Sequence, residues 1–251
     1  TAGAGNDSIT AGAGDEDINA GANDDTIVMA GNLTSADTID GDSGTDTLTY
    51  TDAGGTDELD NVVKVETITL GNAATNVTTV TGLVTSTNTL TVDGSALTGS
   101  GKTLTFTGSA ETNGGKFSIT GGDQADTIVG GSGDDTITGA AGADSITAGG
   151  GDDVIVGAQD DTLIDGGAHS SKDILQIGAA FNDTGNEKIV NVEEVQVTAA
   201  DLTVSLEEQT ENLTVIGHSS GATTIITGTG NDTVTGGSGN DSLVGGSGND
   251  S

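Results

Sequence analysis

Aspartates recur in three parts of this 251-residue chain at a spacing of about nine residues, and an aliphatic residue usually follows two positions later. Carboxylate oxygens are preferred ligands of hard divalent cations, and Ca²⁺ takes about 6–8 oxygens in a flexible shell that Mg²⁺ does not favour. Glycines precede the aspartates, and glycine permits tight turns that direct backbone carbonyls at one ion. We therefore predict several bound Ca²⁺ ions, with the following metal ligands: Asp7, Asp25, Asp37, Asp46, Asp126, Asp135, Asp144, Asp153, Asp161, Asp173, Asp232, Asp241 and Asp250.

These positions are not equivalent. Glu16 stands where an aspartate is expected, and inserted residues precede Asp37 and Asp173. We expect Asp135 and Asp144, which lie inside a regular run, to contribute more to ion binding than Asp173. Asp or Asn often stands immediately before the aspartate, where we expect it to stabilise the turn rather than to bind the ion.

A nine-residue motif, G-G-x-G-x-D-x-U-x with U aliphatic, positions the aspartates. Its eighth position, from Gly121 onward, is occupied by Ile128, Ile137, Ile146, Ile155 and Leu163. Alternation over the last three positions predicts a short strand whose aliphatic residue points into a narrow core. We predict three such arrays, over residues 1–49, 121–176 and 227–251, the last of them incomplete.

Two Thr- and Val-rich segments, residues 50–120 and 177–226, separate the arrays. Their alternating pattern predicts further β-strands. The segments are related to each other, because the stretch that begins at Val62 aligns without gaps to the stretch that begins at Ile189. We expect an all-β chain in which wider β-helical rungs and narrow rolls form one continuous solenoid. The alternative is two small β-sandwich domains linked by rolls.

The motif resembles the RTX nonapeptide family, and the resemblance covers about half of the chain. It implies a parallel β-roll, in which six residues form a Ca²⁺-binding turn and three form a strand, with two motifs in each turn of the coil. The tandem arrangement of arrays and Thr/Val segments looks like the calcium-dependent surface-layer, extracellular matrix and adhesin proteins of bacteria.

The composition narrows the classes of function. A net charge of −34 disfavours binding to nucleic acid or anionic lipid, and no stretch is apolar enough to be inserted in a membrane. His169 and His218 lie in Gly/Ser-rich turns without a catalytic motif. The repeated acid pairs, such as Asp134 with Asp135, lack the two different environments that acid–base catalysis needs. Glu193 and Glu194 are interpreted as solvated residues. We therefore expect no enzyme in this chain.

The function expected from the sequence is that of a secreted, calcium-binding structural protein of the bacterial cell surface or extracellular matrix. It would be exported unfolded, by type I secretion, and would fold and self-assemble on Ca²⁺ binding as a surface-layer or matrix lattice or filament subunit. Its main partner would be itself, with a cell-surface glycan as a second candidate. The alternatives are a calcium-rigidified adhesin stalk and the RTX portion of a secreted toxin or hydrolase with its catalytic domain elsewhere. The chain opens and stops within a repeat, so we expect a longer polypeptide around it.

Overall fold

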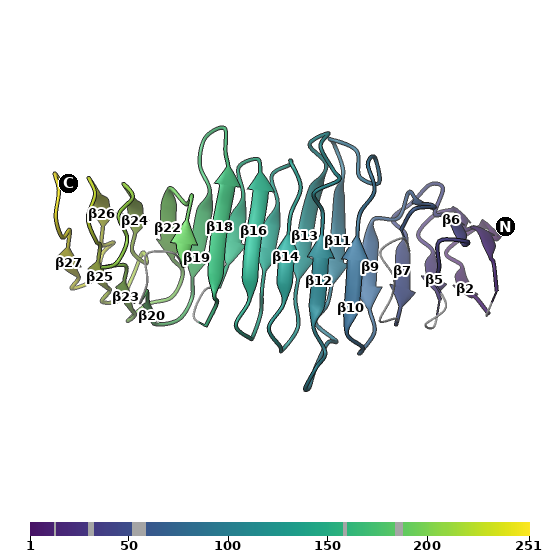
Figure 1. The fold of residues 1–251 in the computed structure, drawn as a ribbon, viewed down its shortest axis with the longest axis horizontal. Helices are drawn as coiled ribbons and strands as arrows, with labels where there is room; N and C mark the ends of the chain where they lie inside the picture. The colour runs from purple at the N-terminus through teal and green to yellow at the C-terminus, as the bar shows by residue number, and fades with distance from the viewer. Residues whose placement is uncertain (13, 30–32, 52–58, 158–159, 184–187) are drawn as a thin grey trace.

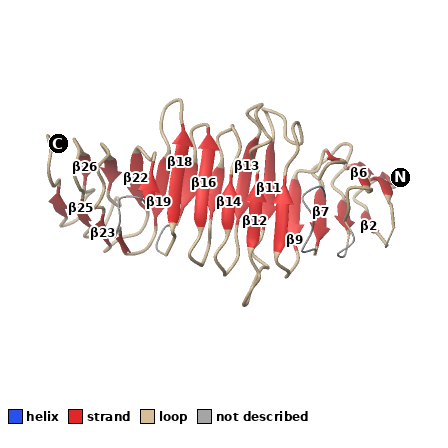
Figure 2. Ribbon diagram, in the orientation of Figure 1, coloured by secondary structure: helices blue, strands red, loops and turns tan. Residues whose placement is uncertain are grey.

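The computed structural model describes residues 1–12, 14–29, 33–51, 59–157, 160–183 and 188–251. Within those ranges the chain forms strands and turns and no helix (Figure 2). A search of the described residues for a helix long and apolar enough to cross a membrane found none. The molecule is elongated, with the N-terminus at one end and the C-terminus at the other, and the chain advances steadily between them (Figure 1).

One long parallel sheet runs along the molecule from its first rung to its last, with twelve described strands. Each strand between the two end strands pairs with the strand one rung before and the strand one rung after. In order, the strands are β2 (Ser8–Thr10), β5 (Thr26–Val28), β7 (Thr47–Tyr50), β9 (Thr67–Leu70), β11 (Thr89–Asp93), β13 (Lys116–Thr120), β15 (Thr136–Thr138), β17 (Val154–Val156), β19 (Ile174–Ile177), β22 (Glu194–Val197), β24 (Thr214–Ile216) and β26 (Thr233–Thr235).

Shorter parallel sheets follow one another along the rest of the solenoid. Near the N-terminus these are β1 (Gly3–Ala4) with β4 (Gly21–Ala22), and β3 (Asp17–Asn19), β6 (Thr38–Asp40) and β8 (Val62–Val63). The central sheet contains β10 (Thr75–Thr78), β12 (Leu104–Thr107), β14 (Thr127–Val129), β16 (Ser145–Gly150), β18 (Leu163–Ala168) and β21 (Ile189–Val190). The last sheet contains β20 (Phe181–Asn182), β23 (Thr203–Ser205), β25 (Thr224–Ile226) and β27 (Ser242–Val244).

The width of the rungs changes along the chain while the sheet stays continuous. In the second array, Ile137 pairs with Ile155, so one rung is two motifs long. In the Thr/Val segment before it, Val77 pairs with Phe106, and the rung between them takes up a longer stretch of chain. The extra residues lie in turns, so the strands remain in register on both sides. The prediction of an all-β, continuous parallel solenoid is therefore confirmed, whereas the array boundaries stay a prediction.

The core is a column of inward-facing side chains whose size follows the width of the rung. In the narrow rungs the motif's aliphatic residues are fully buried, as at Ile137 and Ile155. In the wider part the rings of Phe106 and Phe117 pack edge to face, with centroids 5.1 Å apart. Larger side chains thus fill the space that the longer turns open.

One inward-facing position differs from the prediction. Leu163 was expected to point into the core, but Ile164 is fully buried and Leu163 only partly so. Ile164 pairs with the buried Ile146, and Leu163 pairs with the outward-facing Ser145. The prediction was wrong by one residue, and because successive side chains of a strand point to opposite faces, a slip of one residue exchanges inside for outside.

Candidate metal centres in the stacked turns

The motif aspartates form rows along the solenoid because each one from Asp25 onward accepts a hydrogen bond from the backbone of the preceding rung. The backbone N–H of Asp135 donates to Asp153 Oδ1 at 2.7 Å, and that of Asp126 donates to Asp144 Oδ1 at the same distance. Backbone amides of other residues complete the pattern, as where Phe117 N donates to Asp135 Oδ1. One carboxylate oxygen of each such aspartate is thereby fixed in place, and the rows bring carboxylates from successive rungs together.

In six of the motif aspartates the second carboxylate oxygen, Oδ2, is available to bind a cation. It is buried and has no hydrogen-bond partner among the described residues in Asp25, Asp46, Asp144, Asp153, Asp173 and Asp232. Leaving a buried charged oxygen without a partner costs free energy, so such oxygens are normally paired with a charge or coordinate a metal. These six residues are all candidate ligands predicted from the sequence.

Glycine brings a backbone carbonyl close to these oxygens. A Cβ added to Gly130 would lie 2.0 Å from the carbonyl oxygen of Ala148 and 2.5 Å from Asp135 Oδ2. No side chain fits there, so carboxylate and carbonyl oxygens of different rungs converge on the same small space. An oxygen-rich site of this kind suits Ca²⁺. Aspartate carboxylates and neighbouring backbone carbonyls are therefore the groups that would hold the ions.

Burial alters the protonation of the aspartates in the second array. Desolvation raises the pKa of Asp135, Asp144 and Asp153 each to about 7, even though backbone N–H donors act in the opposite direction. In the absence of a cation these carboxyls would thus hold protons far above their usual range. A bound cation would remove that penalty by stabilising the charged form.

Two predicted ligands in the second array use both carboxylate oxygens as hydrogen-bond acceptors. Asp126 Oδ2 accepts from Gly122 N at 2.6 Å, and Asp135 Oδ2 accepts from Gly131 N at 2.9 Å. A carboxylate oxygen has more than one lone pair, so these oxygens could still contact an ion beside the amide. Both donors are glycines of the same turn as the aspartate that they contact.

Both carboxylate oxygens of Asp37 also accept hydrogen bonds. It accepts from Glu16 N at one oxygen and from the Thr34 backbone and hydroxyl at the other. Although burial raises the pKa of Asp37, these hydrogen bonds outweigh it and lower the pKa overall. Part of the insertion before Asp37 lies outside the described residues.

The four remaining candidates are less enclosed. Asp7, Asp161 and Asp241 are half-buried, and Asp250 is exposed in the last rung. Asp161 Oδ1 accepts from Asp144 N at 3.2 Å, so it continues its row despite the irregular motif. All thirteen assignments as Ca²⁺ ligands stay predictions.

In several turns the acidic or amide residue before the motif aspartate contacts the backbone of a neighbouring rung, which fits the turn-stabilising role predicted for it. Asp152 N donates to Asp134 Oδ1 at 3.0 Å, and Asn249 N donates to the side-chain oxygen of Asn231 at 2.9 Å. These side chains thus join successive rungs through backbone amides on the outer side of the turn.

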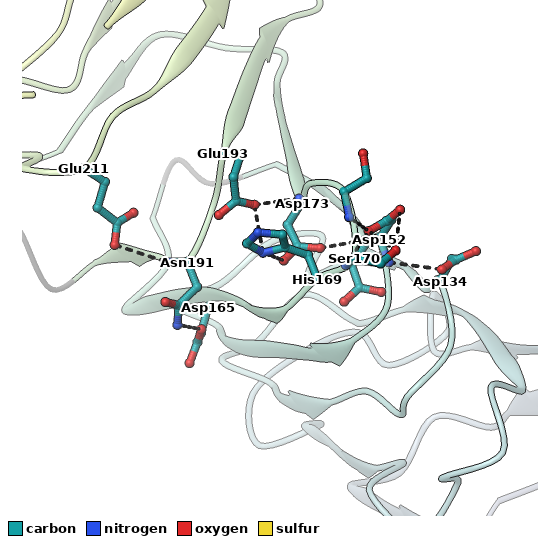
Figure 3. A network of polar contacts seen from close by, with 11 residues as sticks. Asp134, Asp152, Asp165, His169, Ser170, Asp173, Asn191, Glu193 and Glu211 are labelled. Carbon is teal, nitrogen blue, oxygen red and sulfur yellow. Dashed lines mark hydrogen bonds and ion pairs between the residues drawn. The ribbon is translucent and has the colours of Figure 1, made fainter. Parts of the chain in front are cut away.

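Sequence reasoning missed two glutamates that end the rows. Asp46 N donates to Glu66 Oε2, and Asp173 N donates to Glu193 Oε2, each at 2.8 Å. Glu193 was interpreted as solvated, but it occupies the place of the next aspartate in its row. Its side chain also contacts His169, as Figure 3 shows. The long internal repeat, which aligns these glutamates, was the signal that could have identified them.

The interpretation of Glu194 as solvated was wrong. Its side chain is buried and forms an ion pair with Lys172 and a hydrogen bond with Gln196. Lys172 belongs to the inserted turn, which thereby contacts the first residue of β22. The contact could not be inferred from the sequence, because the two residues are 22 positions apart and meet only through the width of the rung.

Fold and site together define a parallel β-solenoid whose acidic, glycine-rich turns stack into rows of candidate cation ligands. The comparison with family models agrees: four segments of the chain match the RTX calcium-binding nonapeptide repeat, at residues 1–27, 34–50, 120–155 and 219–251. These segments are RTX repeats, as the motif predicted. Searches of curated proteins and of solved structures each found no match.

Proposed function

We propose that this chain is a calcium-binding extracellular structural protein that folds on Ca²⁺ binding and then associates with itself. The observation that supports it best is the set of buried Oδ2 atoms without hydrogen-bond partners in the described turns. RTX nonapeptide repeats bind Ca²⁺, and RTX proteins are generally secreted. A structural role, rather than a catalytic one, accords with sites that repeat in equivalent surroundings along the solenoid.

Coupling of folding to Ca²⁺ follows from the charge. The chain carries −34, and its motif carboxylates are stacked rung on rung. Without cations these carboxylates repel one another or must be protonated, so the folded form is disfavoured. Ions that bind only the folded form stabilise it by mass action. An unfolded chain could then be exported and would fold where Ca²⁺ is abundant.

Self-association would use the long sheet. Its outward positions are rich in threonine, as at Thr67, Thr91 and Thr136, and they lie on one continuous face of the rod. Repeated polar faces suit lateral contacts that extend into sheets or fibres. A surface-layer or matrix lattice, or a filament, is the assembly we propose, with a cell-surface glycan as a further partner.

A rigid adhesin stalk is the second candidate, because one sheet continuing along the described rungs makes a stiff spacer. Circular dichroism during Ca²⁺ titration tests the folding step, with Mg²⁺ as the control. Electron microscopy and light scattering with and without Ca²⁺ test assembly. Ordered arrays that dissolve in chelator support the lattice, whereas a folded, monodisperse chain at high concentration supports the stalk. A catalytic domain found outside the 251 residues of this sequence would favour a secreted toxin or hydrolase.

A further inference from the structure

Two places in the solenoid share one arrangement, and the difference between them indicates a second kind of site. We name the turn of residues 41–46 with Glu66 the first junction, and the turn of residues 166–173 with Glu193 the second junction. In both, the last aspartate of a row donates its backbone N–H to the glutamate of the next rung at 2.8 Å. In both, the aspartate's Oδ2 is buried and has no hydrogen-bond partner among the described residues.

The second junction has a longer turn, and the longer turn carries His169. His169 Nδ1 lies 3.2 Å from Glu193 Oε2 and 3.6 Å from Asp173 Oδ2. Ligand atoms from these three residues all lie within 4.8 Å of one another. Figure 3 shows the imidazole of His169 beside the carboxylates of Glu193 and Asp173.

The geometry is that of ligands prepared for one small cation. Two atoms each about 2.1 Å from a tetrahedral Zn²⁺ lie about 3.4 Å apart, close to both observed distances. Asp173 Oδ1 accepts from Asp153 N at 2.7 Å, so the carboxylate is held with Oδ2 facing His169. Glu193 is held by the backbone of Asp173. Hydrogen bonds of this kind orient metal ligands.

The chemistry of the donors distinguishes this site from the others. Ca²⁺ is bound by oxygen ligands, whereas imidazole nitrogen together with carboxylate oxygen suits Zn²⁺ and similar divalent cations. The Asp173 side chain is fully buried, while those of His169 and Glu193 are about one-third exposed, which leaves a path for an ion. The turn of the second junction also lies outside the segments that match the calcium-binding repeat, whereas the turn of the first lies within one.

We propose that His169, Asp173 and Glu193 form a binding site for a divalent transition cation, with Zn²⁺ as its representative, at the end of the second array. Water would complete the coordination on the exposed side. The site does not depend on self-assembly of the chain. It would fasten the inserted turn to the next rung, where the calcium rows end.

The test measures Zn²⁺ binding to the full chain at saturating Ca²⁺, by competition with a chromophoric chelator. We expect one tightly bound Zn²⁺ per chain, and His169→Gln should weaken its binding by at least about tenfold. His218→Gln is the matched control, because the hydrogen bonds of His218 Nδ1 among the described residues are with Ser220 of its own turn. It should leave the affinity unchanged. Circular dichroism of each variant verifies folding.

Co²⁺ substitution supplies an independent measurement. Visible d–d bands should appear in the wild-type chain and in His218→Gln, and be lost in His169→Gln. Equal Zn²⁺ affinity in the His169→Gln variant and the wild-type chain would overturn the proposal. So would complete displacement of the Zn²⁺ by added Ca²⁺, which would show an ordinary oxygen site. The proposal would also be overturned if the wild-type chain bound no Zn²⁺ while His169→Gln lowered stability. His169 would then be only an ion-pair partner of the carboxylates.

Discussion

The two junctions share one backbone arrangement. They differ in the side chain that faces their aspartate and glutamate carboxylates. In each, a residue with left-handed backbone, Lys64 or Asn191, has φ of 54° and places its carbonyl against the first glycine of the turn. In each, its side chain contacts the aspartate before that glycine: Lys64 Nζ lies 3.2 Å from Asp40, and Asn191 Nδ2 lies 2.7 Å from Asp165.

What separates them is the lengthening of one turn. It moves no strand, since β19 and β22 pair in regular register, and β7 and β9 do so at the first junction. It nevertheless adds an imidazole to a pair of carboxylates. A solenoid can therefore change the chemistry of a single rung while its neighbours keep theirs, because turns lengthen outward without disturbing the stacked strands.

The largest effect expected is from removal of Ca²⁺, which would destabilise all three arrays and both junctions. Chelator should convert most of the β-structure to coil, because uncompensated carboxylates in the rows repel and lose their burial. Far-UV circular dichroism before and after chelation measures this, and readdition of Ca²⁺ should restore the spectrum while Mg²⁺ should not. A β-rich spectrum that survives chelation would contradict it.

Low pH should partly replace Ca²⁺ in stabilising the folded chain, because it protonates the buried carboxyls. Asp135, Asp144 and Asp153 have pKa values raised to about 7 by burial, and burial also raises the pKa of Asp46 and Asp173 at the junctions. A carboxyl whose folded pKa is raised stabilises the fold below its unfolded pKa, and this stability is lost as pH rises through the folded value.

The chelated chain should therefore gain β-structure as pH falls from about 8 toward 5, and the Ca²⁺ concentration at the folding midpoint should fall over the same range, because protonation supplies part of the stability that bound ions supply at higher pH. Circular dichroism at several pH values, with chelator or with graded Ca²⁺, measures both. If the chelated chain is equally unfolded at every pH in this range, ionisation of the buried carboxyls is not what opposes folding.

Single aspartate substitutions should show that the interior of the second array contributes more to Ca²⁺-dependent folding than the second junction does. Asp135→Ala leaves the backbone N–H groups of Phe117 and Gly131 without an acceptor, a cost of roughly 2–6 kcal/mol. Asp173→Ala leaves only Asp153 N without one, a cost of about 1–3 kcal/mol. The Ca²⁺ midpoint should therefore rise more for Asp135→Ala than for Asp173→Ala.

Asp134→Ala is the control for this pair. Asp134 is exposed, so water can replace it as the acceptor of Asp152 N, and its ion pair with Lys116 is worth at most about 1 kcal/mol. A larger shift of the midpoint for Asp173→Ala than for Asp135→Ala would refute the ranking and would make the junction, not the array interior, the main calcium site.

The smallest effect expected is from exchange of the left-handed residues. Lys64→Asn should stabilise the first junction slightly, and Asn191→Lys should destabilise the second, each by less than about 1 kcal/mol, because Asn tolerates left-handed backbone better than Lys. Urea unfolding at saturating Ca²⁺ measures the change. Shifts of the same sign in both variants would show that side-chain contacts, not backbone conformation, decide these positions.

Much of this fold was accessible from the sequence because its pattern is local. Alternation over three residues determined that Ile137 and Ile155 point inward, and the fixed offset from glycine to aspartate determined that Asp135 and Asp153 lie in turns. Both properties depend on bonds between near neighbours in the chain. The stacking of one motif on the next then follows from equal repeat length.

The tertiary structure decided what depends on residues one rung away. Whether an aspartate has a free oxygen differs between Asp37 and Asp173, because nearby turn residues occupy one carboxylate and not the other. The inward position moved from Leu163 to Ile164, and Glu193 proved to end a row of aspartates. Each rung brings together groups that are far apart in the chain, and its length is set by how its turns pack against their neighbours, which no local pattern records.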